Sequence, residues 1–247
     1  MKNNYFYKKL LSNIYKKPSK TSEVTSQIIY GERFNILSKN KNWLKIKTSF
    51  DNYIGYIKNE NYINNFKPTH KVFVLKASIF NRTKKETKKF LTFGSKISII
   101  QKNKRFIEFE KNKWIKKIDI KKVNHIEKNY LKILKLFLNT KYIWGGKTYK
   151  GIDCSSILQL IFYYNNKFYP RDTKDQIRYS KKKNNNIFKK GSIIFWKGHV
   201  AICINSKKLI HAYGPEKKVL IMPIKETIEK IERTTKLIVK KISSIEY

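Results

Sequence analysis

Cysteine is scarce in this chain, whose 247 residues include only Cys154 and Cys203. Two thiols in a chain of this size give no indication of a disulfide scaffold, the device that stabilises many small secreted domains. Long apolar runs are also missing. No stretch reaches the roughly 18 apolar residues of a membrane span, and the first eleven residues have no apolar stretch of signal-peptide length. We therefore expect a protein of the cytoplasm, where thiols stay reduced.

Acidic residues are few, since 17 Asp and Glu stand against 56 Lys and Arg and give a formal net charge of +39. Such a balance is typical of proteins that bind nucleic acid or an anionic membrane. The lysines are spread along the chain instead of forming a basic tail, and Lys, Asn, Ile and Tyr are all abundant, as expected from an AT-rich genome. We interpret the charge as mainly compositional and expect no specific nucleic-acid partner. A positive surface still speeds encounter with acidic ligands.

What the chain does contain is a cysteine at the predicted start of a helix. Asp153-Cys154-Ser155 leads into an apolar run that ends at Tyr164 and is followed by two asparagines. This pattern predicts a buried helix beginning at Cys154. Amide groups at a helix start stabilise negative charge, so we expect a displayed thiol with a lowered pKa.

A candidate base lies downstream, where residues 198–205 alternate as in a strand. This alternation places His199, Ala201 and Cys203 on one face. Residues 209–212 predict the next strand, with 205–208 as the hairpin turn. His211 then lies beside His199 and orients its ring, which completes an arrangement of nucleophile, base and orienting group.

Several motifs occur in the order and near the spacing of a known family. The chain resembles the NlpC-type papain-like cysteine peptidases of bacteria over roughly residues 125–247, in the segments Tyr142–Gly146, Asp153–Ser155, Pro170–Thr173, Gly191–Trp196, Gly198–Ile202 and His211–Ala212. Two departures are Ser156, where many members carry glycine, and Lys190-Gly191-Ser192 in place of the usual Pro-Gly-Asp.

The resemblance implies a role for each matching residue. Cys154 is the implied nucleophile and His199 the implied general base and acid. His211 is the polar residue that holds the imidazole, and the hydroxyl of Tyr142 lies near the oxyanion hole. Neither a metal nor an organic cofactor is implied.

Other interpretations of the same residues remain open. Free cysteine is commonly buried, which is our interpretation of Cys203. A Cys154–Cys203 disulfide would consume the nucleophile. Both cysteines together with His199 and His211 could form a zinc site, although the short paired spacings of common zinc sites are absent. The remaining two histidines, His70 and His125, lie outside every motif and are interpreted as structural or surface residues.

The first half of the chain contains an internal repeat. Residues 27–37 align with 89–100, glycine on glycine and with an aromatic residue before each, and a tryptophan strand follows in both copies, at Trp43 and Trp114. Short alternating strands at this spacing predict two small β-barrels, which resemble bacterial SH3-like domains. The predicted fold class is α+β, with SH3-like barrels at 1–66 and 67–124 before a papain-like catalytic domain at 125–247.

Residues 51–57 at the end of the first barrel resemble the dipeptidyl-peptidase branch of the family. In that branch a barrel tyrosine and the Asp and Ser beside the nucleophile bind the free amine of an N-terminal L-alanine. The implied substrate-binding residues are Tyr53, Asp153, Ser155, Asp172 and Glu32. Alternatively, Tyr53 is an ordinary strand aromatic, Glu32 a solvated turn charge, Asp153 a helix cap and Asp172 a turn residue. The second barrel lacks this ending and is interpreted as a spacer or rigidifier.

The resemblance implies a cysteine peptidase that cuts the γ-D-glutamyl to diamino acid bond of small murein peptides with a free N-terminal L-alanine, in cell-wall recycling. A broader murein endopeptidase, or an amidase or acyltransferase on the same fold, is the alternative enzyme. A wall-binding or nucleic-acid-binding protein with an inactive catalytic domain is the alternative outside enzymology.

Overall fold

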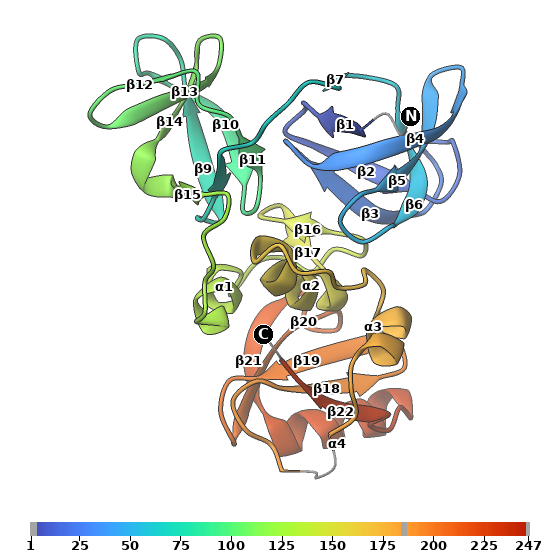
Figure 1. Cartoon of the computed structure of the whole chain (residues 1–247). Coiled ribbons are helices and arrows are strands. Elements are labelled where there is room, and N and C mark those ends of the chain that lie inside the picture. Colours follow the sequence, from blue (N-terminus) through green and yellow to red (C-terminus); the bar gives the residue numbers. More distant parts are fainter. Residues whose placement is uncertain (1–3, 184–186, 246–247) are drawn as a thin grey trace. The chain divides into compact units, whose positions relative to one another are not determined.

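The computed structural model describes residues 4–183 and 187–245. The chain divides into two compact units, drawn in Figure 1. The N-terminal unit comprises Met1–Glu127 together with Tyr164–Asn166, and the C-terminal unit comprises Lys128–Tyr163 and Lys167–Tyr247.

The first part of the N-terminal unit is an antiparallel sheet with the order β3-β2-β6-β5-β4-β1-β7. Its strands are β1 (Asn4–Tyr7), β2 (Leu11–Tyr15), β3 (Val24–Ile29), β4 (Arg33–Asn40), β5 (Trp43–Thr48), β6 (Ile54–Lys58) and β7 (Tyr62–Ile63). Strand β5 shows the alternation that the sequence predicts, because Leu44, Ile46 and Thr48 are buried and the residues between them are partly exposed. The core of this barrel consists of Tyr7, Ile14, Ile28, Phe34, Leu44, Ile46 and Ile57.

The second part of the unit has two antiparallel sheets, with the orders β10-β9-β14-β13-β12 and β11-β8-β15. Its strands are β8 (His70–Val72), β9 (Lys76–Phe80), β10 (Glu86–Thr92), β11 (Lys96–Ile97), β12 (Gln101–Lys102), β13 (Phe106–Glu110), β14 (Lys113–Lys116) and β15 (Ile120–Lys122), and the 3₁₀ turn η1 (Lys117–Asp119) precedes β15. The predicted domain boundary at 66/67 falls between β7 and β8 and stays a prediction, as does the boundary at 124/125.

The two aligned glycines of the repeat occupy the same kind of turn. Gly31 has φ +75° and Gly94 has φ +80°, a left-handed conformation that glycine adopts without a steric penalty. A Cβ atom at Gly31 would lie 2.0 Å from the carbonyl oxygen of Lys96. The aromatic residues before the glycines, Tyr30 and Phe93, are both buried.

Tyr30 joins the cores of the two barrels. Although it follows β3 of the first barrel, it packs in the apolar cluster of the second, against Phe109. Its hydroxyl donates to Glu110 at 2.6 Å, and Lys8 pairs with the same carboxylate at 2.5 Å. Burial of Tyr30 from one barrel in the core of the other explains why the two form one compact unit.

The C-terminal unit combines helices with an antiparallel sheet of order β21-β20-β19-β18-β22 and the short hairpin β16-β17. Its elements are α1 (Tyr130–Leu136), β16 (Lys147–Thr148), β17 (Gly151–Ile152), α2 (Cys154–Tyr164), α3 (Thr173–Tyr179), β18 (Ser192–Trp196), β19 (His199–Cys203), β20 (Lys208–Tyr213), β21 (Lys218–Pro223), α4 (Ile224–Thr235) and β22 (Lys241–Ser244). The helix predicted to begin at Cys154 and end at Tyr164 is confirmed. Cys203 lies in a core cluster with residues of β18, β20 and α4, as interpreted from the sequence.

Candidate active site

Cys154 begins helix α2, and its sulfur lies against the start of strand β19. The carboxylate of Asp153 accepts from the backbone amide of Ser156 at 2.8 Å, which caps the first turn of the helix. The Sγ atom lies 3.8 Å from the carbonyl oxygen of Gly198 and 4.0 Å from the hydroxyl of Thr173. The thiol is therefore fixed beside the backbone that carries His199.

The expectation of a displayed thiol with a lowered pKa is wrong for this structure. Cys154 is only 3% exposed. Burial raises the pKa of the thiol to about 12, and the negative charge of Asp153 adds to the increase, while hydrogen bonds from Val200 and Thr173 and the charge of Arg171 oppose it. Loss of hydration thus outweighs the stabilisation that a helix start gives to an anion. A raised pKa favours the neutral thiol over the thiolate.

His199 and His211 lie on neighbouring strands, as predicted. Strands β19 and β20 pair with Ile202 opposite Ile210 and Cys203 opposite Leu209. Continued along the strands, this register brings His199 and His211 to the same face as diagonal neighbours. The Nε2 atom of His199 lies 2.9 Å from the Nδ1 atom of His211, so the Nδ1 atom of His199 remains for a second partner.

The environment of the two rings keeps them neutral. His211 is fully buried and stacks on Tyr213, with ring centroids 4.7 Å apart. Burial lowers the pKa of His199 to about 4, and burial together with His199 and Lys230 lowers the pKa of His211 well below its usual value. A neutral imidazole accepts a proton, which is the state that a general base requires.

Tyr142 lies close to the sulfur. It forms an isolated bridge with Ile152, two residues before Cys154, and its backbone amide donates to Lys217 at 2.8 Å. Burial raises the pKa of its hydroxyl, and the charges of Cys154 and Asp153 raise it further. The phenol therefore stays protonated, the state in which it can donate a hydrogen bond.

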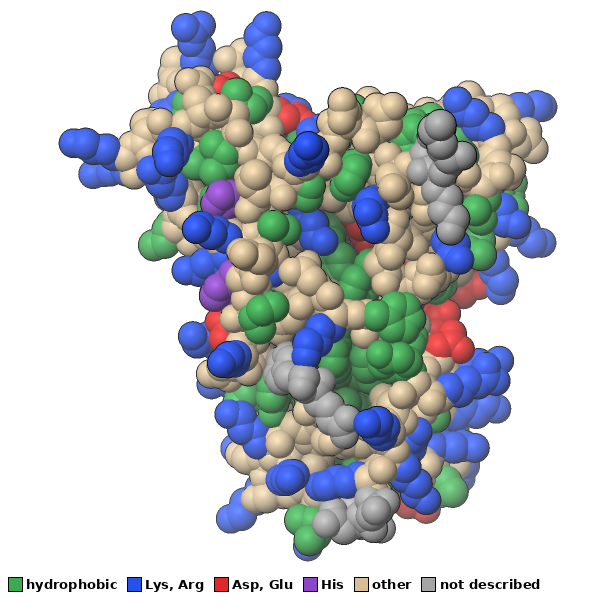
Figure 2. Space-filling model, in the orientation of Figure 1, with side chains coloured by type: hydrophobic (Ala, Val, Ile, Leu, Met, Phe, Trp, Pro, Cys, Tyr) green, Lys and Arg blue, Asp and Glu red, His purple; other side chains and the backbone are tan. Residues whose placement is uncertain are grey.

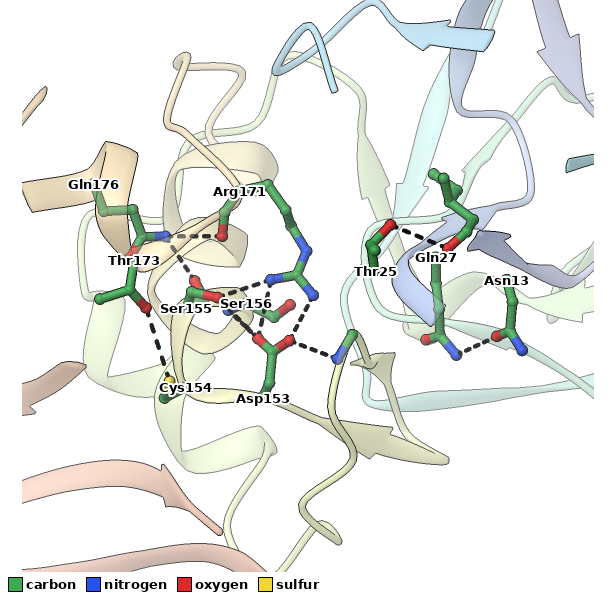
Figure 3. Close-up of polar contacts among 12 residues, drawn as sticks. Asn13, Thr25, Gln27, Asp153, Cys154, Ser155, Ser156, Arg171, Thr173 and Gln176 are labelled. Carbon is green, nitrogen blue, oxygen red and sulfur yellow. Dashed lines mark hydrogen bonds and ion pairs between the residues drawn. The ribbon is translucent and has the colours of Figure 1, made fainter. Parts of the chain in front are cut away.

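Asp153 and Ser155, which flank the cysteine, belong to a buried polar network around Arg171 (Figure 3). The guanidinium of Arg171 contacts both carboxylate oxygens of Asp153, at 3.0 and 2.6 Å, and the hydroxyl of Ser155 at 2.8 Å. The amide of Gly145 donates to the same carboxylate at 2.9 Å. Asp153 therefore caps α2, as the alternative interpretation proposed, and also joins the loop before β16 to the segment before α3.

Arg171, Thr173 and Gln176 are site residues whose roles the sequence analysis missed. Gln176 donates from its amide to the carbonyl oxygens of Ser155 and Pro170, each at 2.9 Å. Arg171 and Thr173 belong to the Pro170–Thr173 motif, but the sequence analysis gave them no role in the site. One signal could have identified them. The segment after Pro170 has few apolar side chains, so a helix there must bury polar side chains at helical spacing.

The remaining candidates are Asp172, Tyr53 and Glu32. Asp172 is exposed at the N-terminus of α3, where its side chain makes no capping hydrogen bond. Tyr53 and Glu32 belong to the N-terminal unit. Tyr53 is partly buried against the core of the first barrel. Glu32 is 2% exposed and accepts from the amide of Ile29 at 3.0 Å, so the interpretation as a solvated turn charge is wrong.

Other features of the described residues bear on the alternatives. Both cysteines are free thiols, so the disulfide is absent. Within residues 4–183 and 187–245, no group of three or more His, Cys, Asp or Glu side chains is placed to hold a metal ion. None of the helices in the described part of the chain is long and apolar enough to cross a membrane.

Two family models match the chain. Residues 139–237 match the NlpC/P60 family, and residues 14–61 match the bacterial dipeptidyl-peptidase SH3 domain. The chain contains an NlpC/P60 domain preceded by a bacterial dipeptidyl-peptidase SH3 domain. The NlpC/P60 match includes every predicted catalytic residue, and the SH3 match includes Tyr53 and Glu32.

Named relatives extend the similarity over most of the chain. A γ-D-glutamyl-L-lysine dipeptidyl-peptidase from Bacillus subtilis is 24% identical over 230 residues, which cover 83% of this chain and 77% of that protein. Dipeptidyl-peptidase 6 from Lysinibacillus sphaericus is 23% identical over 231 residues, which cover 82% of this chain and 85% of that protein. Together with the NlpC/P60 domain, these relatives support a peptidase.

A solved structure has the same fold. The crystal structure of an NlpC/P60 family protein from Bacillus cereus covers 90% of this chain and 94% of its own, with a TM-score of 0.78 and 18% identity. This similarity, with the SH3 match and the mixture of helices and sheets, confirms the predicted α+β class with SH3-like barrels before a papain-like domain.

Proposed function

We propose that this protein is a cysteine peptidase that hydrolyses the γ-D-glutamyl to diamino acid bond of murein peptides. The observation that carries the proposal is the position of the Cys154 sulfur, 3.8 Å from the carbonyl oxygen of Gly198. Gly198 directly precedes His199, whose ring lies 2.9 Å from that of His211. The choice of bond is supported by the names of relatives that span most of the chain.

Each residue of the site has its own role in the proposed acyl transfer. His199 takes the thiol proton as Cys154 attacks the amide carbonyl, and the sulfur–carbon bond of a tetrahedral intermediate forms. Tyr142 donates to the oxyanion. His199 then returns the proton to the leaving amine, and water hydrolyses the thioester through the same base. Because burial raises the pKa of Cys154 to about 12 and lowers that of His199 to about 4, the proton moves during attack and the resting enzyme holds no thiolate.

The finer proposal is a dipeptidyl-peptidase that takes small peptides with a free N-terminal L-alanine. An ammonium in a desolvated pocket needs an anionic partner and hydrogen-bond acceptors. We assign that task to Asp153 and Ser155 of the C-terminal unit and to Tyr53 of the first barrel. Asp172 and Glu32 supply further negative charge.

The test is release of L-Ala-γ-D-Glu from a defined murein tripeptide, followed by mass spectrometry. We expect Cys154→Ala to abolish release while the protein stays folded, and Cys203→Ala to retain it, because Cys203 lies in a core cluster away from the thiol chemistry. Undiminished release by the Cys154→Ala variant would refute the assignment.

Tyr142→Phe tests the oxyanion role. Loss of a preorganised donor costs about 3–4 kcal/mol of transition-state stabilisation, a fall of roughly 10²–10³ in kcat. We expect KM and thermal stability to change little, because only one hydroxyl is removed. An unchanged kcat in steady-state assays on the tripeptide would exclude Tyr142 from the oxyanion site.

One observation favours a broader murein endopeptidase as the second candidate. The carboxylate of Asp153 is already paired with the buried guanidinium of Arg171, which reduces the negative charge available for a substrate ammonium. The two candidates differ in their response to a blocked amine. Acetylation of the substrate N-terminus stops a dipeptidyl-peptidase and leaves an endopeptidase active, so the acetylated and free tripeptides are compared in the same assay.

We further propose that the protein acts in the cytoplasm on turned-over wall peptides. The two free cysteines support this proposal, since thiols stay reduced in that compartment. Cell fractionation with antibodies against the protein, alongside markers for cytoplasm, membrane and medium, tests the location. Recovery in the medium would contradict the recycling role.

A further inference from the structure

The Cys154 sulfur has two kinds of polar neighbour outside the histidine pair. The carbonyl oxygen of Gly198, 3.8 Å away, can only accept a hydrogen bond, so the thiol donates to it. The hydroxyl of Thr173 lies 4.0 Å from the sulfur. A thiol has a single proton. When that proton is donated to Gly198, the hydroxyl of Thr173 is the donor in the second contact.

The two contacts respond in opposite ways when the thiol loses its proton. The lone pairs of Gly198 then face an anion, which is unfavourable. The hydroxyl of Thr173 instead becomes a donor to a charged acceptor, and hydrogen bonds to charged groups are stronger than those between neutral groups. Thr173 therefore favours the anionic sulfur, and Gly198 favours the neutral one.

The position of Thr173 is fixed by its surroundings. It is the first residue of α3, and its side chain is 7% exposed. One turn of helix later, Gln176 is fully buried and ties α3 to the start of α2 through the carbonyl oxygen of Ser155. Figure 3 shows the hydroxyl of Thr173 directed at the sulfur and the amide of Gln176 directed at Ser155. The hydrogen bond from Gln176 to Ser155 thus holds α3, and with it Thr173, against the helix that carries the nucleophile.

We propose that Thr173 is a positioning residue that donates a hydrogen bond to the Cys154 sulfur and stabilises the anion formed as the thiol attacks. The inference deepens the proposed function, because it rests on Cys154 as the nucleophile. The groups that act on the sulfur also include Asp153, which disfavours the anion, and Arg171 and the amide of Val200, which favour it. Tyr142 also interacts electrostatically with the sulfur. Thr173 supplies a side-chain hydroxyl that substitution can remove without changing a charge.

The test compares Thr173→Val, which keeps the shape and loses the hydroxyl, with Thr173→Ser, which keeps the hydroxyl. Thr227→Val is the matched control. Thr227 is a buried threonine of α4 whose hydroxyl donates to the carbonyl oxygen of Pro223, the residue directly before the helix, at 2.7 Å. The rate of iodoacetamide alkylation at Cys154 is measured from pH 6 to 10 by peptide mapping, which separates Cys154 from Cys203.

We expect Thr173→Val to slow alkylation about tenfold at each pH, which is a shift of the profile by about one unit to higher pH. Thr173→Ser should restore the rate to within about threefold, and Thr227→Val should match the wild type. In the peptide assay, Thr173→Val should lower kcat with little change in KM. Alkylation of Thr173→Val at the wild-type rate would overturn the proposal, and so would a Thr173→Ser variant as slow as Thr173→Val, because packing would then explain the loss.

Alkylation does not require peptide cleavage, so the two proposals fail separately. A wild-type protein that cleaves no murein peptide would refute the proposed function and leave the alkylation comparison valid. Normal cleavage with unshifted alkylation in Thr173→Val would refute only the role of Thr173.

Discussion

At the scale of single residues, the site is governed by competition between burial and local polarity. Cys154 has a helix start, an amide and a hydroxyl that all favour an anion, yet burial raises its pKa to about 12. Burial lowers the pKa of His199 to about 4. The two pKa values shift in opposite directions, and each shift favours the neutral form of its group. The reaction that we propose therefore begins with a proton transfer between two neutral groups.

The pH dependence of Cys154 reactivity tests this view. Only the thiolate attacks iodoacetamide. A raised thiol pKa means that the fraction of thiolate increases with pH throughout the range below that pKa, so we expect the alkylation rate to increase about tenfold per pH unit from pH 6 to 9. A plateau of fast alkylation at pH 5–6 would instead indicate a thiolate–imidazolium pair and would contradict the neutral resting state.

At the scale of elements, the Asp153–Arg171 pair holds the site together. Asp153 bonds to the start of α2 and to the loop at Gly145, while Arg171 comes from the segment before α3. Side-chain exposure is 1% for Arg171 and 6% for Asp153. A buried pair of this kind is not a large net source of stability, but removal of one partner leaves the other charge buried and unpaired.

We expect Arg171→Met to destabilise the C-terminal unit by about 3–5 kcal/mol for that reason. Hydrogen exchange of the α2 amides measures the change locally. Arg178→Met is the matched control, because Arg178 lies on α3 and contacts Asp175 at 3.7 Å with both side chains largely exposed. Loss of such a surface pair costs less than about 1 kcal/mol. Equal protection in the two variants would show that the buried pair has no structural role.

At the scale of the whole molecule, the dominant feature is positive charge. Figure 2 shows Lys and Arg side chains scattered over the visible face, with few acidic side chains among them. The formal net charge of +39 destabilises a compact chain by self-repulsion. A few pairs offset it locally, among them Lys8–Glu110 between the barrels and Lys230–Glu216 in the C-terminal unit, at 2.5 and 2.6 Å.

We expect added monovalent salt to stabilise the protein, because the screening length falls from about 30 Å at 0.01 M to about 8 Å at 0.15 M. Thermal unfolding is recorded in NaCl and in KCl at each ionic strength. Similar increases in Tm in both salts would indicate screening rather than binding of a particular cation. A Tm that falls with salt would show that the attractive pairs outweigh the repulsion.

The sequence by itself determined the local features of this protein. The apolar run after Cys154 and the alternation around His199 gave the bounds of α2 and β19 closely, because a run ended by polar residues and a period of two are both local patterns. The glycines that align in the repeat, Gly31 and Gly94, adopt the same left-handed conformation in the structure, which glycine allows without a steric penalty.

Only the tertiary structure decided the electrostatics and the supporting contacts. Burial of the Cys154 sulfur reversed the direction of its expected pKa shift, since desolvation depends on segments distant in sequence. The pairing of Asp153 with Arg171, 18 positions later, and the contact of Thr173 with the sulfur, 19 positions after Cys154, arise when the segment before α3 packs against α2. Tyr30 likewise enters the core of the second barrel through long-range packing, which no local pattern encodes.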